Sequence, residues 1–141
     1  MSRVEGVTFY PLKCVSEEDG SLVPIDLGND VPFEAKRLFY VYGVPEGDKR
    51  GGHAHLTTKQ LLICVNGRIN VTCDDGNTRQ TFSLDSPSKA LYIPEMIWDE
   101  CEYALQNSIL MVVSSTSYNP KDYIEDYDYF VGCTREGNKN M

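Results

Sequence analysis

The sequence predicts an all-β protein built as a double-stranded β-barrel, followed by a short C-terminal helix. Short runs rich in Val, Ile, Leu, Tyr and Phe recur about every ten residues and alternate with turn signals, which is the pattern of an antiparallel sandwich or barrel. A chain of 141 residues is long enough to bury one substantial core. We therefore expect a single domain over residues 1–141, with residues 134–141 forming a flexible tail.

Nine apolar runs are the predicted strands. They are Val7–Leu12, Ser21–Ile25, Ala35–Tyr42, Gln60–Val65, Arg68–Cys73, Thr78–Leu84, Ala90–Ile93, Trp98–Tyr103 and Ser108–Ser114. Asn66-Gly67 is the strongest turn signal, because both residues accept the positive φ angles of a two-residue hairpin. We therefore expect Gln60–Val65 to pair directly with Arg68–Cys73. The three-to-four spacing of apolar residues over Tyr123–Phe130 predicts the helix.

Charge and cysteine content exclude several classes of partner. Thirteen Lys and Arg residues against 21 Asp and Glu residues give a net charge of −8, which would repel a nucleic-acid backbone. The longest apolar runs are about five residues, far below the ~20 that span a bilayer. The five cysteines are an odd number without CxxC spacing, as expected in a reducing compartment. We expect a cytoplasmic protein that binds neither nucleic acid nor membranes.

The two histidines of the chain are the first candidates for chemistry. His53 and His55 lie two residues apart where a loop passes into a strand, and the two-residue period of a strand places them on one face. If that face is the inner surface of the barrel, both imidazoles enter one pocket. Arg50 would lie at its entrance, and Gly51 and Gly52 would let a ligand approach closely. Imidazoles titrate near neutrality, which suits proton transfer.

The spacing around these histidines is similar to the first cupin motif. Gly47, His53, His55, Gln60 and Gly67 occupy its positions. Cupins that hold a metal usually have Glu where this chain has Gln60, and they take a further His from a second motif. Two imidazoles and a neutral amide make a weak site for a divalent metal ion. We therefore expect no metal and no other cofactor.

A closer resemblance extends over nearly the whole chain. The residues that carry it are Asp19-Gly20-Ser21-Leu22-Val23, Pro32-Phe33, Lys36-Arg37-Leu38-Phe39-Tyr40, Arg50-Gly51-Gly52-His53-Ala54-His55, Asp74-Asp75-Gly76, Trp98, Asp122-Tyr123-Ile124 and Tyr127-Asp128. Together they resemble the metal-free cupin sugar 3,4-ketoisomerases that act on dTDP-4-keto-6-deoxyglucose. The chain differs from many members at Asp19, where they carry Arg, and at Asp99, where they carry His. We expect nucleotide or sugar contacts to differ there.

The resemblance implies a fold, a reaction and a set of site residues. The fold is the cupin, or jelly-roll, barrel, assembled as a homodimer with exchanged N-terminal strands. The reaction moves the keto group of a dTDP-linked 4-keto-6-deoxysugar from C4 to C3 through an enediol, in the biosynthesis of an unusual deoxysugar. The implied catalytic residues are His53, His55 and Tyr40, and the implied substrate-binding residues are Arg50, Arg37, Gly52 and Trp98.

Two other functions are compatible with the same residues. A nucleotide-sugar epimerase of the same barrel class also removes a proton beside the 4-keto group, but it returns the proton to the same carbon. Such epimerases generally pair one His with an Asp and a Tyr, so the His-x-His pair favours ketoisomerisation. A non-catalytic cupin that binds a sugar is the second alternative, although binding alone gives no reason for two imidazoles on one inner face.

Overall fold

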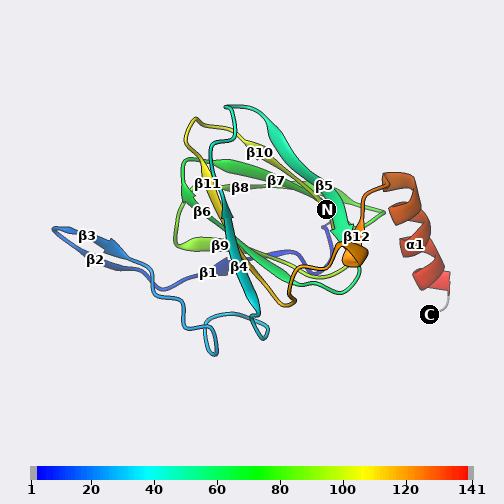
Figure 1. The fold of residues 1–141 in the computed structure, drawn as a ribbon, viewed down its shortest axis with the longest axis horizontal. Helices are drawn as coiled ribbons and strands as arrows, with labels where there is room; N and C mark the ends of the chain where they lie inside the picture. Colours follow the sequence, from blue (N-terminus) through cyan, green and yellow to red (C-terminus); the bar gives the residue numbers. More distant parts are fainter. Residues whose placement is uncertain (1–2, 140–141) are drawn as a thin grey trace.

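The computed structural model describes residues 3–139, in which two five-stranded antiparallel sheets face each other (Figure 1). The first sheet contains, in spatial order, β1 (Thr8–Pro11), β9 (Lys89–Ile93), β6 (Gln60–Asn66), β11 (Ile109–Ser114) and β4 (Arg37–Val41). The second contains β12 (Tyr123–Ile124), β5 (Lys49–His55), β10 (Trp98–Tyr103), β7 (Ile69–Asp74) and β8 (Arg79–Leu84). From β8 to β11 the chain alternates between the sheets. The predicted all-β, cupin-like class is confirmed, with the barrel open between the sheets.

The main core lies between the sheets, and strand β6 of the first sheet is apolar on both of its own faces. Leu62 and Cys64 point into this core, whereas Leu61 and Ile63 point to the outer face of the first sheet. That outer face is covered by the segment after the N-terminal hairpin, which contributes Val31. A strand buried on both faces reads as a continuous apolar run rather than as an alternating one.

The turn at Asn66-Gly67 does not form the predicted hairpin. β6 pairs with β9 and β11, while β7 pairs with β8 and β10. Gly67 has φ of +85° but Asn66 has no positive φ, and a type I′ turn needs both. Instead the Asn66 side chain donates to the backbone oxygen of Asn107 at 2.8 Å, and the Arg68 N–H donates to Ser108 Oγ at 3.2 Å. These bonds hold the turn against the β10–β11 connection, so it carries the chain from one sheet to the other.

The C-terminal helix is confirmed, but it begins later and extends further than predicted. A 3-10 turn (Pro120–Asp122) and β12 precede α1, which runs over Tyr127–Lys139. The Asp126 side chain accepts the Tyr129 N–H at 2.9 Å and so caps the first turn. Residues 134–139 of the expected flexible tail belong to α1, and its last two residues lie outside the described chain. No helix within residues 3–139 is long and apolar enough to cross a membrane.

The N-terminal hairpin projects from the body of the protein (Figure 1). β2 (Val15–Glu17) and β3 (Gly20–Leu22) pair only with each other, and all six residues are exposed. β1, by contrast, pairs with β9 of the same chain.

We predict that Gly67→Ala destabilises the fold. A Cβ at this position would meet Ser108 Oγ and lie 2.9 Å from Ser108 Cα, and the positive φ adds strain. The free energy of unfolding should fall by about 1–3 kcal/mol in denaturant titrations. Gly132→Ala is the matched control, since it lies in α1 with open space around it and should be neutral or stabilising. Equal stability of Gly67→Ala and wild type would contradict the account of this turn.

Candidate active site

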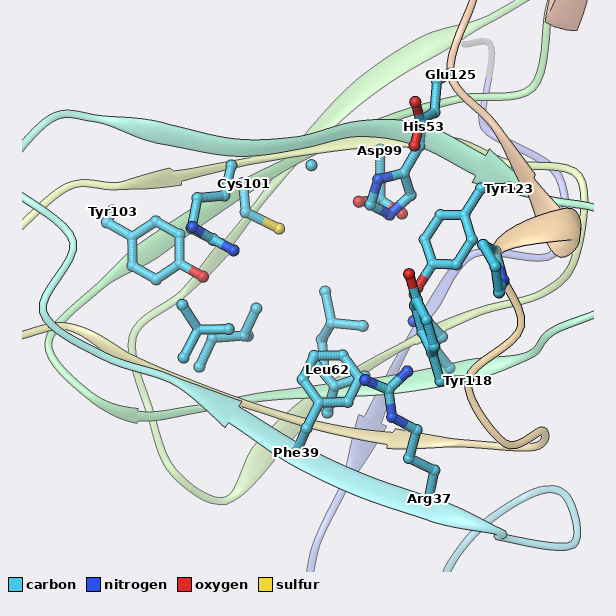
Figure 2. A pocket seen from close by; sticks show the side chains of 17 residues that line it. Arg37, Phe39, His53, Leu62, Asp99, Cys101, Tyr103, Tyr118, Tyr123 and Glu125 are labelled. Carbon is cyan, nitrogen blue, oxygen red and sulfur yellow. The ribbon is translucent and has the colours of Figure 1, made fainter.

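A cavity of about 400 Å³ opens between the two sheets (Figure 2). This is within the size range of small-molecule sites. Its walls come from both sheets and from the segment that leads to α1. The polar side chains among the lining residues are those of Arg37, Arg50, His53, Gln60, Asp99, Tyr103, Tyr118, Tyr123 and Glu125. Cationic, acidic, phenolic and imidazole groups therefore face one cavity.

A glycine bulge in β5 sets the direction of His53. In the pairing with β10, His53 lies opposite Asp99 and Gly51 lies opposite Glu100, so Gly52 is the extra residue. Gly51 and Gly52 have φ of +96° and +77°, which side-chain-bearing residues rarely adopt. Gly51 lines the cavity, whereas the predicted ligand-binding residue Gly52 does not. Gly52 thus acts on the site by shaping β5.

The predicted placement of both imidazoles on one side of β5 agrees with the structure. The ring centroids of His53 and His55 are 5.2 Å apart, and the Tyr123 ring lies 5.0 Å from the first and 4.5 Å from the second. Only His53 lines the large cavity. His55 is buried and borders a small neighbouring cavity together with Gln60 and Asp122.

Asp122 is a site residue whose partnership with His55 sequence reasoning missed. Its carboxylate accepts a hydrogen bond from His55 Nδ1 at 3.1 Å, from the Thr57 N–H at 2.9 Å and from Thr57 Oγ1 at 2.7 Å. Thr58 Oγ1 donates to the same carboxylate. An ionised carboxylate only accepts, so Nδ1 carries the proton and His55 Nε2 is left as an acceptor. Nε2 is buried and has no hydrogen-bond partner within residues 3–139.

The surroundings keep both imidazoles neutral at pH 7. Burial, together with a smaller contribution from the neighbouring His55, lowers the pKa of His53 to about 4. Burial also lowers the pKa of His55, although the hydrogen bond and charge of Asp122 oppose that effect. Burial by itself would raise the pKa of Asp122, but the bonds from Thr58, Thr57 and His55 outweigh it and lower that pKa. The site therefore contains two unprotonated imidazoles, one of which is held by a carboxylate.

Asp99 is the second residue that acquires a clear place only in the structure. It is 5% exposed, lines the cavity, and has an Oδ2 atom without a hydrogen-bond partner among the described residues. Burial raises the pKa of this carboxyl to about 7, with a smaller contribution from the charge of Glu100. A large share of the Asp99 carboxyl is therefore protonated at neutral pH.

The two predicted arginines both line the cavity. The Arg37 guanidinium lies 4.4 Å from the Phe39 ring centroid and 5.1 Å from that of Tyr118. Neither Arg37 nor Arg50 forms an ion pair with another side chain in the part of the chain that the structure describes. Their charges remain available to an anionic ligand.

Tyr40, predicted as a catalytic residue, lies outside this cavity. Arg37, Phe39 and Val41 of β4 line the cavity, so Tyr40 between them points to the opposite face. Its side chain is 64% exposed and stacks near Tyr42.

Trp98, predicted to bind the substrate, also points away from this cavity. Asp99 and Cys101 of β10 line the cavity, and Trp98 packs on the other side against α1. Its ring lies 5.3 Å from the Tyr127 ring and 5.8 Å from the Phe130 ring. Trp98 is a core residue that anchors the helix.

We predict that NMR titration resolves two histidines with lowered pKa values, that of His53 near 4. Asp122→Asn should lower the pKa of His55 further, because it removes the charge that opposes burial, and should move His53 much less. The unfolded chain binds more protons than the folded chain between about pH 4 and 6.5. The stability contributed by the neutral His53 is therefore complete above pH 6.5 and lost as the pH falls toward 4. A His53 that titrates at 6.5 would contradict this electrostatic description.

Comparison with known proteins shows the family of this chain. The family model described as "FdtA: WxcM-like, C-terminal" matches residues 5–135. The TDP-4-oxo-6-deoxy-alpha-D-glucose-3,4-oxoisomerase of Aneurinibacillus thermoaerophilus is 38% identical over 118 residues, which cover 84% of this chain and 85% of that protein.

Solved structures of sugar 3,4-ketoisomerases are also similar to this chain. QdtA, a sugar 3,4-ketoisomerase from Thermoanaerobacterium thermosaccharolyticum solved in complex with TDP, has a TM-score of 0.91 and 30% identity over 95% of this chain and 98% of its own. A histidine-to-asparagine mutant of QdtA was solved with TDP-4-keto-6-deoxyglucose. WlaRA, a TDP-fucose-3,4-ketoisomerase from Campylobacter jejuni, has a TM-score of 0.85 and 34% identity over 92% of this chain and 96% of its own. This chain belongs to the FdtA family of sugar 3,4-ketoisomerases.

Proposed function

We propose that the protein is an isomerase that converts dTDP-4-keto-6-deoxy-D-glucose into a dTDP-3-keto-6-deoxyhexose in deoxysugar biosynthesis. The observation that carries the proposal is the neutral His53 in the cavity wall, backed by His55 and Asp122 in a member of this family. The relatives are sugar 3,4-ketoisomerases, which supports this reaction over the epimerase and the binding-only alternatives. An epimerase would leave the keto group at C4, and a binding module would leave the sugar unchanged.

The chemistry requires a group that moves a proton between neighbouring carbons. The 4-keto group acidifies the C–H bond at C3, so a base can remove that proton and leave an enediol, which is reprotonated at C4. We assign this transfer to His53, since it borders the cavity in which a sugar would lie. His55 is the positioning residue behind it, held by Asp122. A neutral imidazole contributes on the order of 10²–10⁴-fold as a general base.

The cations at the cavity suit a nucleotide diphosphate. The chain as a whole is acidic, so recognition of an anion depends on local cations, and Arg37 and Arg50 supply them at the cavity. We propose that these guanidinium groups bind the diphosphate.

Gln60 also borders the cavity, and its neutral amide supports a reaction that needs no metal ion.

We predict that His53→Asn and His55→Asn each fold normally and lose activity by about 10²-fold or more, assayed with dTDP-4-keto-6-deoxyglucose. The double variant should be little worse than either single variant, because the two imidazoles act as one unit. Tyr40→Phe is the control and should keep its activity, since that ring faces away from the cavity. A folded histidine variant with near-wild-type turnover would remove that residue from the mechanism.

We further propose a cytoplasmic homodimer in which the N-terminal hairpin is exchanged. The hairpin exposes Leu22 and Val15, and the outer face of the edge strand β4 exposes Leu38 and Tyr40. Exposed apolar groups and a free strand edge are features that a twofold partner covers. All five cysteines are unpaired, which supports a reducing compartment.

We predict a dimer by light scattering at micromolar concentration. Leu22→Asp should shift the protein toward monomer, because it replaces an apolar side chain of the proposed interface with a charged one. Leu22 is 59% exposed in the single chain. Ser83→Asp, on the exposed face of β8, is the control and should stay dimeric. A full-length monomer at that concentration would refute the exchange.

A further inference from the structure

We propose that Asp99 is a further catalytic group, whose carboxyl exchanges hydroxyl protons with the two neighbouring oxygens of the keto sugar while His53 moves the carbon-bound proton. The inference rests on the proposed function and assigns a residue to it. It starts from three properties of Asp99: its burial, its orphaned oxygen and its place next to His53.

The geometry brings the acid and the base to one wall of the cavity. Asp99 lies directly opposite His53 in the β5–β10 pairing, at the end of the glycine bulge, so both side chains project from the same face of the sheet. Figure 2 shows the two at the same wall of the cavity. A Cβ at Gly51 would crowd Asp99, because it would lie 3.0 Å from the backbone oxygen and 3.3 Å from Oδ1.

The groups around Asp99 carry no charge that would hold it ionised. Across the sheet it faces Cys73 of β7, and on its own strand Cys101 follows on the same face. Burial raises the pKa of both thiols, so both stay neutral, as does His53. Glu100, on the opposite face, disfavours a negative charge on Asp99.

The charged groups farther around the cavity do not change this balance. Arg37, Arg50 and Glu125 line the cavity, but none forms an ion pair with Asp99 within residues 3–139. A buried carboxyl without a cation or a donor is more stable with its proton. It can then donate that proton to a ligand oxygen.

The isomerisation needs such a group, because each half of the reaction moves one proton at carbon and one at oxygen. In the first half His53 takes the C3 proton, the C3–H electrons form the C3=C4 double bond, and the carbonyl oxygen at C4 receives the Asp99 proton. In the second half the hydroxyl at C3 returns a proton to the Asp99 carboxylate as its C=O bond forms, and C4 takes the proton from His53. Both residues end as they began.

The other candidates for the oxygen proton are less well placed. His55 has Nδ1 committed to Asp122 and does not border the large cavity. Burial holds the pKa of Tyr103 well above its ordinary value, so this phenol does not release its proton readily. The Tyr123 hydroxyl remains as a competitor, and the experiment includes it.

The test compares Asp99→Asn with Glu100→Gln, which removes the next carboxyl of β10 from the outer face. With dTDP-4-keto-6-deoxyglucose, Asp99→Asn should lower kcat by about 10²-fold or more, while the Kd for dTDP changes by less than about threefold. Glu100→Gln should keep wild-type turnover. The wild-type kcat/KM should fall as the pH rises above about 7, where Asp99 loses its proton, and Asp99→Asn should lack that decline.

A second measurement needs no variant to be active. In protein labelled with ¹³C at the Asp carboxyls, one signal should titrate near pH 7 and be missing from the spectrum of Asp99→Asn. An Asp99 that is already ionised at pH 5 would overturn the inference. So would Asp99→Asn with wild-type kcat, or Tyr123→Phe losing the high-pH decline in its place. In these cases the wild type still isomerises and the proposed function stands, whereas a wild type without isomerisation removes both.

Discussion

The site depends on the junction between β5 and the segment that follows β11. Asp122 accepts hydrogen bonds from the side chains of His55, Thr57 and Thr58, and its own backbone oxygen accepts the Leu56 N–H at 2.8 Å. Directly after it, β12 pairs with the end of β5, with Tyr123 opposite His55. The buried carboxylate of Asp122 thus fixes the His55 imidazole and keeps Tyr123 in the wall of the cavity. A loss of this junction would free the histidine and open the pocket at the same time.

Alternation along the strands decides which side chains reach the cavity, and this explains which of the predicted site residues line it and which do not. The apolar runs, the turn residues and the His-x-His spacing were sufficient to predict most strands, the helix and the paired imidazoles. Arg37 and Tyr40 are three residues apart, so one strand cannot turn both to the same face. The alternation of side chains along β4 allows only one of them to line the cavity, and in the structure Tyr40 is the one that does not. The same alternation along β10 turns Trp98 away from the cavity and Asp99 toward it.

Other features were beyond the reach of local sequence patterns. Asp122 lies 67 residues from His55, and no spacing rule links them. The Asn66-Gly67 turn has the composition of a hairpin, but its tertiary partners, Asn107 and Ser108, lie about forty residues further along the chain. In both cases long-range hydrogen bonds determine the outcome, and local preference does not.

The electrostatics of the cavity follow from burial more than from net charge. The chain is acidic overall, yet its cavity combines two guanidinium groups with the neutral imidazole of His53 and with the Asp99 carboxyl, which is partly protonated at pH 7. A neutral acid beside a neutral base allows protons to move without a lasting charge in a low-dielectric space. The glycine bulge and the β5–β10 pairing place these two groups next to each other.

The most direct test of the account is to incubate the wild-type protein with dTDP-4-keto-6-deoxyglucose in deuterated water and to determine the product by NMR. We predict a dTDP-linked sugar with its keto group at C3, and deuterium at C4 in the fraction of turnovers in which the proton on His53 exchanges with the solvent before it is returned. A product that keeps the keto group at C4 and carries deuterium at a neighbouring carbon would contradict the account and identify an epimerase. Tight nucleotide binding without any change in the sugar would identify a binding module.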